Sequence, residues 1–333
     1  QSPGDRTTVT ANHTRRLCAL LAVLLTLGAC GGDEKSGAAP EGRTIVLGFD
    51  GMDPNIVSGW MEDGMLPNFS KLAAQGHFSP LATTIPAQSP VAWSGFATGT
   101  DPGQHGDYDF LRRDPETYLP SCSVSETIFP ETAIELGDWH IPLADAQILN
   151  RRQGKPFWNE VEDRGGSATV MRVPVTYPPD DIDHMIAGMG VPDLLGTQGT
   201  YTLYTTRPQN TGQNARIVYM KADAEGRIAT VLEGPPHPLK KELTPLTTPL
   251  EFYPVEGGGT GVIIGDSEFV IQKGEWSDWV NVSYNILNLI NVPCTVRLLL
   301  LDDYPLPLLY FSSIHIYPII PVAPISSPPL YAA

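Results

Sequence analysis

The stretch TIVLGFDGMD, residues 44–53, decides the fold that the sequence predicts. Its first six residues, Thr44–Phe49, are almost all apolar and have the length of a strand. Such a run is typical of a strand buried on both faces of a parallel sheet. Asp50 follows at the carboxyl end of that strand, where open α/β sheets place their ligands. We therefore expect Asp50 to hold a metal ion, with an ordinary Asp-Gly turn as the alternative.

A second stretch, TTIPAQSPVAW at residues 83–93, places a serine at the start of a helix. Ser89 precedes a proline and the helix-like run Val91–Ala97, so the pattern predicts Ser89 as the N-cap and Pro90 as the first helical residue. The N–H groups and the dipole of a helix start favour an anion. Together the two stretches indicate an anion site that contains a hydroxyl group. A plain helix cap is the alternative role for Ser89.

The Gly/Pro-rich stretch ATGTDPGQHG, residues 97–106, completes a pattern known from a family. Ser89 stands nine residues before Thr98, and the three stretches together resemble the alkaline phosphatase superfamily, in its type I phosphodiesterase/nucleotide pyrophosphatase branch. The resemblance implies that Ser89 is the catalytic nucleophile. It also implies two divalent metals, expected to be Zn²⁺, with Asp50 and Ser89 among their ligands. His105 belongs to the loop of this pattern and is expected to fix that loop through hydrogen bonds.

Further blocks extend the resemblance over residues 43–333. They are NRRQGKPFW (150–158), RVPVTYP (172–178), GMGVPDLLGTQG (188–199) and GDSEF (265–269). The implied fold class is α/β, an alkaline-phosphatase-like doubly wound sheet of which the chain holds the N-terminal half only, with a β-rich insertion or cap. Strand and helix patterns alternate in residues 43–204, which we expect to form the α/β phosphatase-like core. Residues 205–333 are expected to form the β-rich insertion or cap and a truncated end.

Local signals place several elements inside the expected core. Pro67–Gln75 is predicted as a helix closed by Gly76, and Lys155–Asp163 as another helix. Ala168–Val173 is predicted as the strand that follows. Asp53 precedes a proline, and we expect it to cap a helix or to begin a turn.

The end of the sequence is unusually apolar. Residues 285–333 contain eight prolines and three charged residues, Arg297, Asp302 and Asp303. In the family such a stretch precedes a half-domain that supplies the remaining metal ligands, including an Asp-His-Gly block and a last His. None of those motifs occurs in the sequence, so we expect a truncated chain that is inactive as a fragment. Asp183-His184 is similar to the metal-binding pair, but it lies in a Pro/Asp-rich loop without the following Gly and is not expected to bind metal.

The first 42 residues have the features of an export signal and a tether. Two arginines precede the apolar run Leu17–Leu27, and residues 27–30, Leu-Gly-Ala-Cys, match a lipobox. The run is too short to span a bilayer. We expect a signal peptide at residues 1–30, acylation of Cys30 and a flexible tether at residues 31–42. These features predict a protein that is lipid-anchored to the bacterial cell envelope, on its periplasmic or outer surface, with an ordinary signal-peptide cleavage site as the alternative.

Composition limits the partners. The net charge is −16, from 37 acidic and 21 basic residues, which argues against nucleic acid as a bulk ligand. A small phosphoester remains a suitable substrate, because metals and a helix start supply local positive potential in an acidic protein. Outside the leader only Cys122 and Cys294 remain, and one pair is not a disulfide framework.

Two hypotheses of function follow from these observations. The first is a membrane-tethered, metal-dependent hydrolase of phosphate monoesters or diesters that acts through a phosphorylated Ser89. The second is a catalytically silent, membrane-anchored surface lipoprotein with a binding or association role. A sulfatase is a distant third, because the sequence after Ser89 lacks the arginine that a Cys/Ser-x-Pro-x-Arg motif requires.

Overall fold

A computed structural model describes residues 42–210 and 215–333. The predicted signal peptide, Cys30 and nearly all of the predicted tether lie outside these residues. Residues 43–162 and 167–333 form the compact unit described below. No helix within the described ranges is both long enough and apolar enough to cross a lipid bilayer.

Helices occur in the first half of this unit, and strands dominate the second half. The helices are α2 (Pro54–Glu62), α3 (Pro67–Gln75), α4 (Ser89–Thr98), α5 (Pro102–His105) and α6 (Phe157–Asp163). The strands up to the parallel pair β7–β8 are β1 (Leu111–Arg113), β2 (Pro120–Cys122), β3 (Ser125–Ile128), β4 (Ala133–Leu136), β5 (Trp139–Pro142), β6 (Gln147–Asn150), β7 (Thr169–Met171) and β8 (His184–Ile186). The later strands are β9 (Tyr201–Thr205), β10 (Ala215–Tyr219), β11 (Ile228–Pro236), β12 (Pro245–Pro254), β13 (Thr260–Ile264), β14 (Ser267–Ile271), β15 (Val280–Ile286), β16 (Ile290–Val296), β17 (Leu298–Asp302), β18 (Leu308–Phe311), β19 (His315–Ile316) and β20 (Ser326–Ser327).

Residues 43–49 have no regular secondary structure and pair with no strand of the described chain. Their apolar side chains lie at the surface, with Ile45 72% and Leu47 74% exposed. The prediction of a buried strand at Thr44–Phe49 is therefore wrong for this structure. An apolar run forms a buried strand only where neighbouring strands accept its backbone hydrogen bonds, and here the described strands pair with one another instead.

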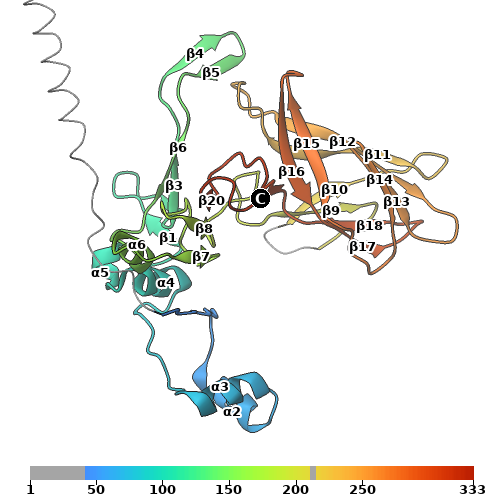
Figure 1. The fold of residues 1–333 in the computed structure, drawn as a ribbon. Coiled ribbons are helices and arrows are strands. Elements are labelled where there is room, and N and C mark those ends of the chain that lie inside the picture. The colour runs from blue at the N-terminus through green and yellow to red at the C-terminus, as the bar shows by residue number, and fades with distance from the viewer. Residues whose placement is uncertain (1–41, 211–214) are drawn as a thin grey trace, which may run out of the picture. The chain divides into compact units, whose positions relative to one another are not determined.

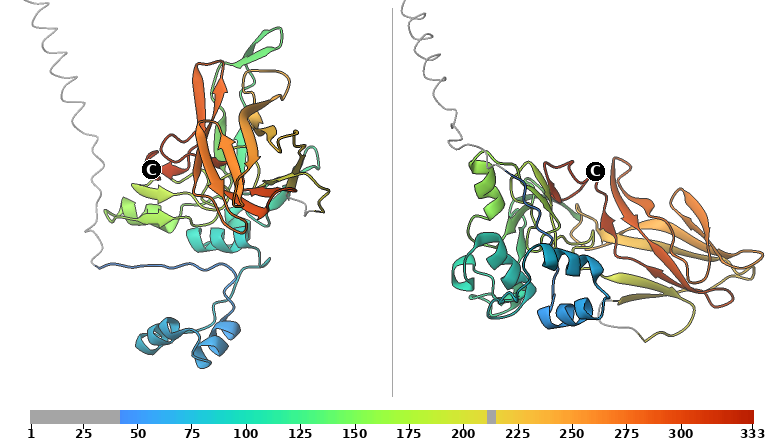
Figure 2. Two further views of the ribbon diagram at one scale, coloured as in Figure 1. Left: turned by 90° about the vertical axis from the view of Figure 1, so that its right-hand side faces the viewer. Right: turned by 60° about the horizontal axis from the view of Figure 1, so that its bottom comes forward.

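Local sequence signals predicted these helices to within one or two residues at their ends. Pro67–Gln75 is α3, as predicted, and it ends before Gly76. Asp53 is the N-cap of α2, where its carboxylate accepts hydrogen bonds from the N–H groups of Asn55 and Ile56. Both views of Figure 2 show α2 and α3 as two blue helices side by side. The predicted helix Lys155–Asp163 begins two residues later than expected, as α6.

A small α/β layer follows these helices. β7 and β8 pair in parallel, and β20 adds to β8 in the antiparallel sense. Ala97 of α4, Trp158 of α6, Val170 of β7 and Met185 of β8 bury their side chains together in one cluster. This cluster joins helix and strand in the α/β manner. The doubly wound sheet itself is not seen in the described residues, where β7–β8 and β9–β10 are the two parallel pairs.

The strands from β9 onward surround a second apolar core. Their sheets have the orders β10-β9-β18-β17, β11-β12-β13-β14 and β15-β16-β19. Along β15 buried and exposed residues alternate strictly, so one face of the strand points into the core. The core includes Leu250 and Phe252 of β12 and Tyr284 of β15. Figure 1 shows β15 beside β12, and the Thr248 hydroxyl on β12 donates to the Ser283 carbonyl of β15 at 2.8 Å.

Candidate active site

Asp50 and Ser89 meet at the surface although they are 39 positions apart in sequence. The Ser89 hydroxyl oxygen lies 3.2 Å from Oδ1 and 3.0 Å from Oδ2 of Asp50, and it donates its proton to that carboxylate. The Trp93 ring N–H donates to Oδ1 of the same carboxylate at 3.3 Å. The structure therefore brings together the two residues that the sequence singled out for catalysis.

Ser89 is the first residue of α4 and not its N-cap. The N-cap is Gln88, and no side chain caps the N-terminus of this helix. The prediction of Ser89 as the capping residue is therefore wrong by one position. This one-residue difference has a chemical consequence, because the hydroxyl of a capping serine accepts a hydrogen bond from a backbone N–H of its own helix. Here the hydroxyl is directed to Asp50.

A close approach of the chain to Trp93 holds Asp50 in place. A Cβ atom on Gly48 would lie 2.4 Å from the Cη2 atom of Trp93, so only glycine lets the indole ring rest against this backbone. Gly51, directly after Asp50, has φ of 64°, a conformation that glycine adopts readily. These two glycines position the carboxylate between Ser89 and Trp93. Trp93 has no role in the pattern predicted from the sequence, and the signal for it is the glycine two positions before Asp50.

His105 and Asp107 form a buried polar network beside α4. The Ser94 hydroxyl of α4 donates to Oδ2 of Asp107 at 2.5 Å, and the Asp107 N–H donates to Nδ1 of His105 at 3.2 Å. The Gln153 N–H also donates to the His105 carbonyl at 2.8 Å. The prediction that His105 fixes its loop through hydrogen bonds is confirmed. Its Nε2 atom is buried and has no hydrogen-bond partner.

Burial sets the protonation of this network. It lowers the pKa of His105 below the usual 6.5, against the opposing charges of Asp107 and Asp101, while the charge of Arg152 adds to the lowering. Burial also raises the pKa of Asp107 above the usual 3.8, against the lowering effects of the Ser94 hydrogen bond and of the charges of His105 and Arg152. Both shifts favour the uncharged forms in the folded protein.

These shifts predict a pH-dependent stability. Because the folded state lowers the pKa of His105, the stabilisation is present above about pH 6.5 and is lost as the pH falls through the lower folded value. His105→Gln should therefore flatten the decrease in unfolding free energy between about pH 7.5 and pH 5, measured by urea unfolding at each pH. A variant that keeps the wild-type slope would contradict this assignment.

Asp107 provides an internal control, because its pKa shift changes the stability with pH in the opposite direction. Because its folded pKa is raised, its contribution is full below about pH 3.8 and is lost as the pH rises through the folded value. Asp107→Asn mimics the protonated acid, so it should remove this loss and raise the unfolding free energy relative to wild type more at neutral than at acidic pH.

The donors at Asp50 fit part of a metal site. A carboxylate and a hydroxyl are oxygen ligands suited to a divalent cation, but structural and catalytic Zn²⁺ sites take three or four protein ligands. Within residues 42–210 and 215–333, no group of three or more His, Cys, Asp or Glu side chains could hold a metal. His184 begins β8 and packs its ring against Tyr331 at 5.1 Å, away from this pair of donors. Two ligands do not complete the centre that the resemblance implies.

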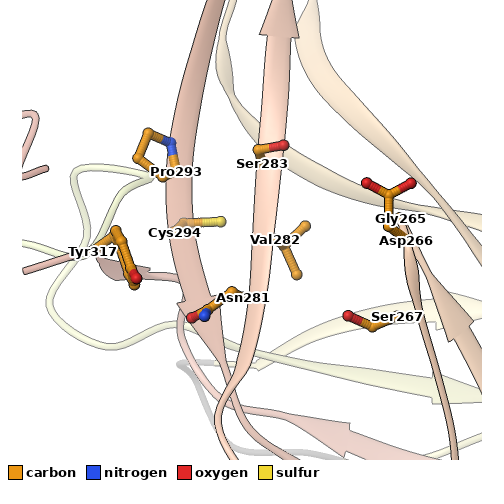
Figure 3. Close-up of a pocket in the computed structure, with 9 residues that line it drawn as sticks. All are labelled: Gly265, Asp266, Ser267, Asn281, Val282, Ser283, Pro293, Cys294 and Tyr317. Carbon is orange, nitrogen blue, oxygen red and sulfur yellow. The ribbon is translucent and has the colours of Figure 1, made fainter. Parts of the chain in front are cut away.

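Two cavities among the described residues are lined by other side chains. One of about 250 Å³ lies on the β-rich part. Figure 3 shows Asn281 and Ser283 on β15, with Tyr317 on one side and Asp266 and Ser267 on the other. A larger cleft of about 930 Å³ lies next to it, because Asn281 and Tyr317 line both. Neither cavity is lined by Asp50 or Ser89.

Comparison with known proteins identifies one family. The family model described as type I phosphodiesterase / nucleotide pyrophosphatase matches residues 44–235, more than half of the chain. The matched range begins at the apolar run before Asp50 and includes Ser89. No curated protein and no solved structure gave a significant match.

Proposed function

The chain belongs to the type I phosphodiesterase/nucleotide pyrophosphatase family, and we propose from this that it hydrolyses phosphoesters with Ser89 as the nucleophile and Asp50 as a metal ligand. Members of this family act on small phosphoester substrates and generally depend on metal ions. One observation carries the proposal. The hydroxyl of Ser89 lies within 3.2 Å of both carboxylate oxygens of Asp50, across 39 positions of sequence and inside the matched range.

The geometry suits a serine that attacks phosphorus. In the proposed step the Ser89 oxygen forms a bond to phosphorus while the bond to the leaving oxygen breaks, and the leaving oxygen keeps the electron pair. The hydroxyl proton leaves along the existing hydrogen bond towards Asp50. The start of α4 favours the negative charge of the phosphoryl group, because first-turn N–H groups lack acceptors within the helix. Water then cleaves the phosphoserine and restores the hydroxyl group.

Metal dependence, and Zn²⁺ as the metal, are parts of this proposal. Asp50 and Ser89 would contribute their oxygen atoms to the metal. A divalent cation bound there would supply Lewis acidity, which stabilises the serine alkoxide and the charge on the transferred group. Within the described residues no group of three or more His, Cys, Asp or Glu side chains completes such a site. The doubly wound sheet remains a prediction for the fold, supported by the family match and by the parallel β7–β8 pair.

The proposed location is the bacterial cell envelope, with a lipid anchor on Cys30. This proposal rests on the lipobox and the apolar run before it. A small phosphoester substrate fits a protein with a net charge of −16 better than a polyanionic nucleic acid does.

The experiment that tests the proposal is a search for the covalent intermediate. The chain is incubated with 4-nitrophenyl phosphate and, in parallel, bis(4-nitrophenyl) phosphate, each with Zn²⁺, Mn²⁺ or Mg²⁺, quenched in acid and digested for mass spectrometry. We expect a phosphoryl group, or a 4-nitrophenyl phosphoryl group from the diester, on Ser89, because acid traps the ester before water cleaves it. Asp50→Ala should reduce the labelled fraction.

Ser58 is the matched control, because it is also a helical serine but donates its hydroxyl to the Pro54 carbonyl at 2.8 Å. Ser58→Ala should leave the labelling unchanged. Labelling that persists in Ser89→Ala, or its absence from the wild type with every metal, would contradict the proposal. The second outcome is the one that a catalytically silent, membrane-anchored lipoprotein predicts, with inactivity as the consequence of an incomplete metal centre.

A further inference from the structure

The loop after β7 holds two residues in a strained backbone conformation. Arg172 has φ of 56° and Val175 has φ of 62°, both in the left-handed region. This conformation is uncommon for any residue with a side chain and is a genuine outlier for a β-branched one. Strain of this kind persists where the surrounding structure enforces it, often at ligand sites.

Hydrogen bonds from several elements enforce this conformation. The Arg172 N–H donates to the Ile186 carbonyl at 2.8 Å, and the Val175 N–H donates to the Met189 carbonyl at 3.0 Å. The side chains of Asn150 and Arg152 both donate to the Val175 carbonyl at 3.1 Å.

Gly188 lets the chain pass this close. A Cβ atom on Gly188 would lie 2.1 Å from the Val173 carbonyl oxygen, a backbone atom that cannot move aside. The strained loop is thus built into the carboxyl ends of the parallel strands β7 and β8, the edge where α/β sheets place ligands.

The strained loop forms one wall of the 930 Å³ cleft. Arg172 lines the cleft from this side, and Trp279, Ser313 and His315 line it from the β-rich part. Backbone hydrogen bonds tie the walls together, from Leu194 to the Ile314 carbonyl at 2.7 Å and from Ala187 to the Ile325 carbonyl at 2.9 Å. At about 930 Å³ the cleft is large enough for a small organic molecule.

The guanidinium group of Arg172 is available to pair with a bound anion. Arg172 takes part in none of the ion pairs of residues 42–210 and 215–333. The Asp193 carboxylate, which also lines the cleft, accepts hydrogen bonds from the N–H groups of Leu195 and Thr197 and from the Thr197 hydroxyl. Groups of its own loop therefore supply the hydrogen bonds that the Asp193 carboxylate accepts.

His315 and Trp279 form the opposite wall. Burial lowers the pKa of His315, Asp193 opposes the lowering and Arg172 adds to it. The lowered pKa favours the neutral imidazole. The Trp279 ring meets the His315 ring edge-on at 5.3 Å and offers an apolar surface.

We propose that this cleft is a second ligand site, distinct from Asp50 and Ser89, which binds a small organic oxyanion with Arg172 as its counter-charge and Trp279 as its apolar wall. The guanidinium group presents a planar fork of N–H donors that matches a carboxylate or a phosphate. Ser313 and His315 offer further polar groups on the opposite wall.

Isothermal titration calorimetry of the whole chain tests the site. Phenylphosphonate, which cannot be hydrolysed, and benzoate are the organic oxyanions, inorganic phosphate is the anion alone, and benzyl alcohol is the neutral analogue. We expect both organic oxyanions to bind more tightly than inorganic phosphate, and benzyl alcohol not to bind. The tighter of phenylphosphonate and benzoate identifies the oxyanion class that the site prefers.

Variants of the cleft give the decisive comparison. Arg172→Asn removes the charge but tolerates the positive φ, and it should weaken both organic oxyanions by about tenfold or more, as expected for the loss of a charge-assisted hydrogen bond. Arg172→Lys should have an intermediate effect. Trp279→Leu should weaken phenylphosphonate but leave inorganic phosphate unchanged. Arg113→Asn, an exposed arginine on β1 outside the cleft, is the matched control and should bind as wild type.

Wild-type affinity in Arg172→Asn, or equal affinity for benzyl alcohol, would overturn the proposal. If Arg172→Asn does not fold, which thermal unfolding reveals, Arg172→Lys and Trp279→Leu decide, and wild-type affinity in both overturns it. Ser89→Ala and Asp50→Ala should leave the binding unchanged. Loss of binding in those two variants would place the ligand at the other site and overturn this inference while leaving the proposed function intact.

Discussion

In a form of the protein whose metal centre is complete, replacing Ser89 with alanine is expected to lower metal-dependent phosphoester turnover by at least about 10³-fold, because loss of the nucleophile removes the covalent intermediate itself. Among the described residues the Ser89 hydroxyl makes hydrogen bonds to Asp50 alone, so its removal should leave the fold of α4 unaffected. The measurement is the initial rate of 4-nitrophenol release from monoester and diester substrates with added divalent metal. The unfolding midpoint of the variant should remain close to that of the wild type.

Ser89→Thr is the control at the same position. Threonine keeps a hydroxyl group on the same carbon, so a nucleophilic role predicts that much of the turnover survives. A structural role at the start of the helix predicts the same turnover in Ser89→Ala and Ser89→Thr. Near-wild-type turnover in the alanine variant would reduce Ser89 to a residue of the helix terminus and remove the central claim of the proposed function.

The pair Asp50 and Ser89 was predictable because each residue is marked by its immediate neighbours. An acid that follows an apolar run and a serine before Pro90 are local signals, and both were found in sequence. The indole of Trp93 was not, because its contact depends on Gly48, 45 positions away in sequence. The exact cap of α4 also escaped prediction, since helix termini are defined only to within one or two residues.

The strand predicted at Thr44–Phe49 shows where sequence reasoning fails. The apolar run indicates that these residues are suited to burial. Whether they form a strand also depends on neighbouring strands that can pair with them, and the run itself does not specify those strands. By contrast, the ends of α3 are marked by Pro67, its first residue, and by Gly76, the residue that directly follows it, so both signals are local. The β-rich texture after residue 205 was recognisable from turns and alternation. The sheet orders were not, because they join strands far apart, such as β9 and β18.

A buried ion pair that the sequence did not reveal stabilises the α/β layer. Arg152 is 2% exposed in its side chain and Asp180 17%, and Nη2 of Arg152 lies 2.8 and 2.9 Å from the two carboxylate oxygens. The Trp158 ring N–H donates to the same carboxylate at 3.0 Å. A second guanidinium nitrogen, Nη1, donates to the Val175 carbonyl of the strained loop. The pair therefore connects α6, the strained loop and the residues after it.

Asp180→Asn is expected to lower the free energy of unfolding by about 3 kcal/mol or more, because it leaves the guanidinium charge of Arg152 buried without compensation. The measurement is urea unfolding at pH 7, followed by circular dichroism. The control is Glu251→Gln, which removes the partner of Arg227 in a pair whose side chains are 46% and 31% exposed, and it should cost less than about 1 kcal/mol. Equal and small losses in both variants would show that solvent screens Arg152 as well as Arg227. The buried pair would then not be what holds the strained loop at the end of β7.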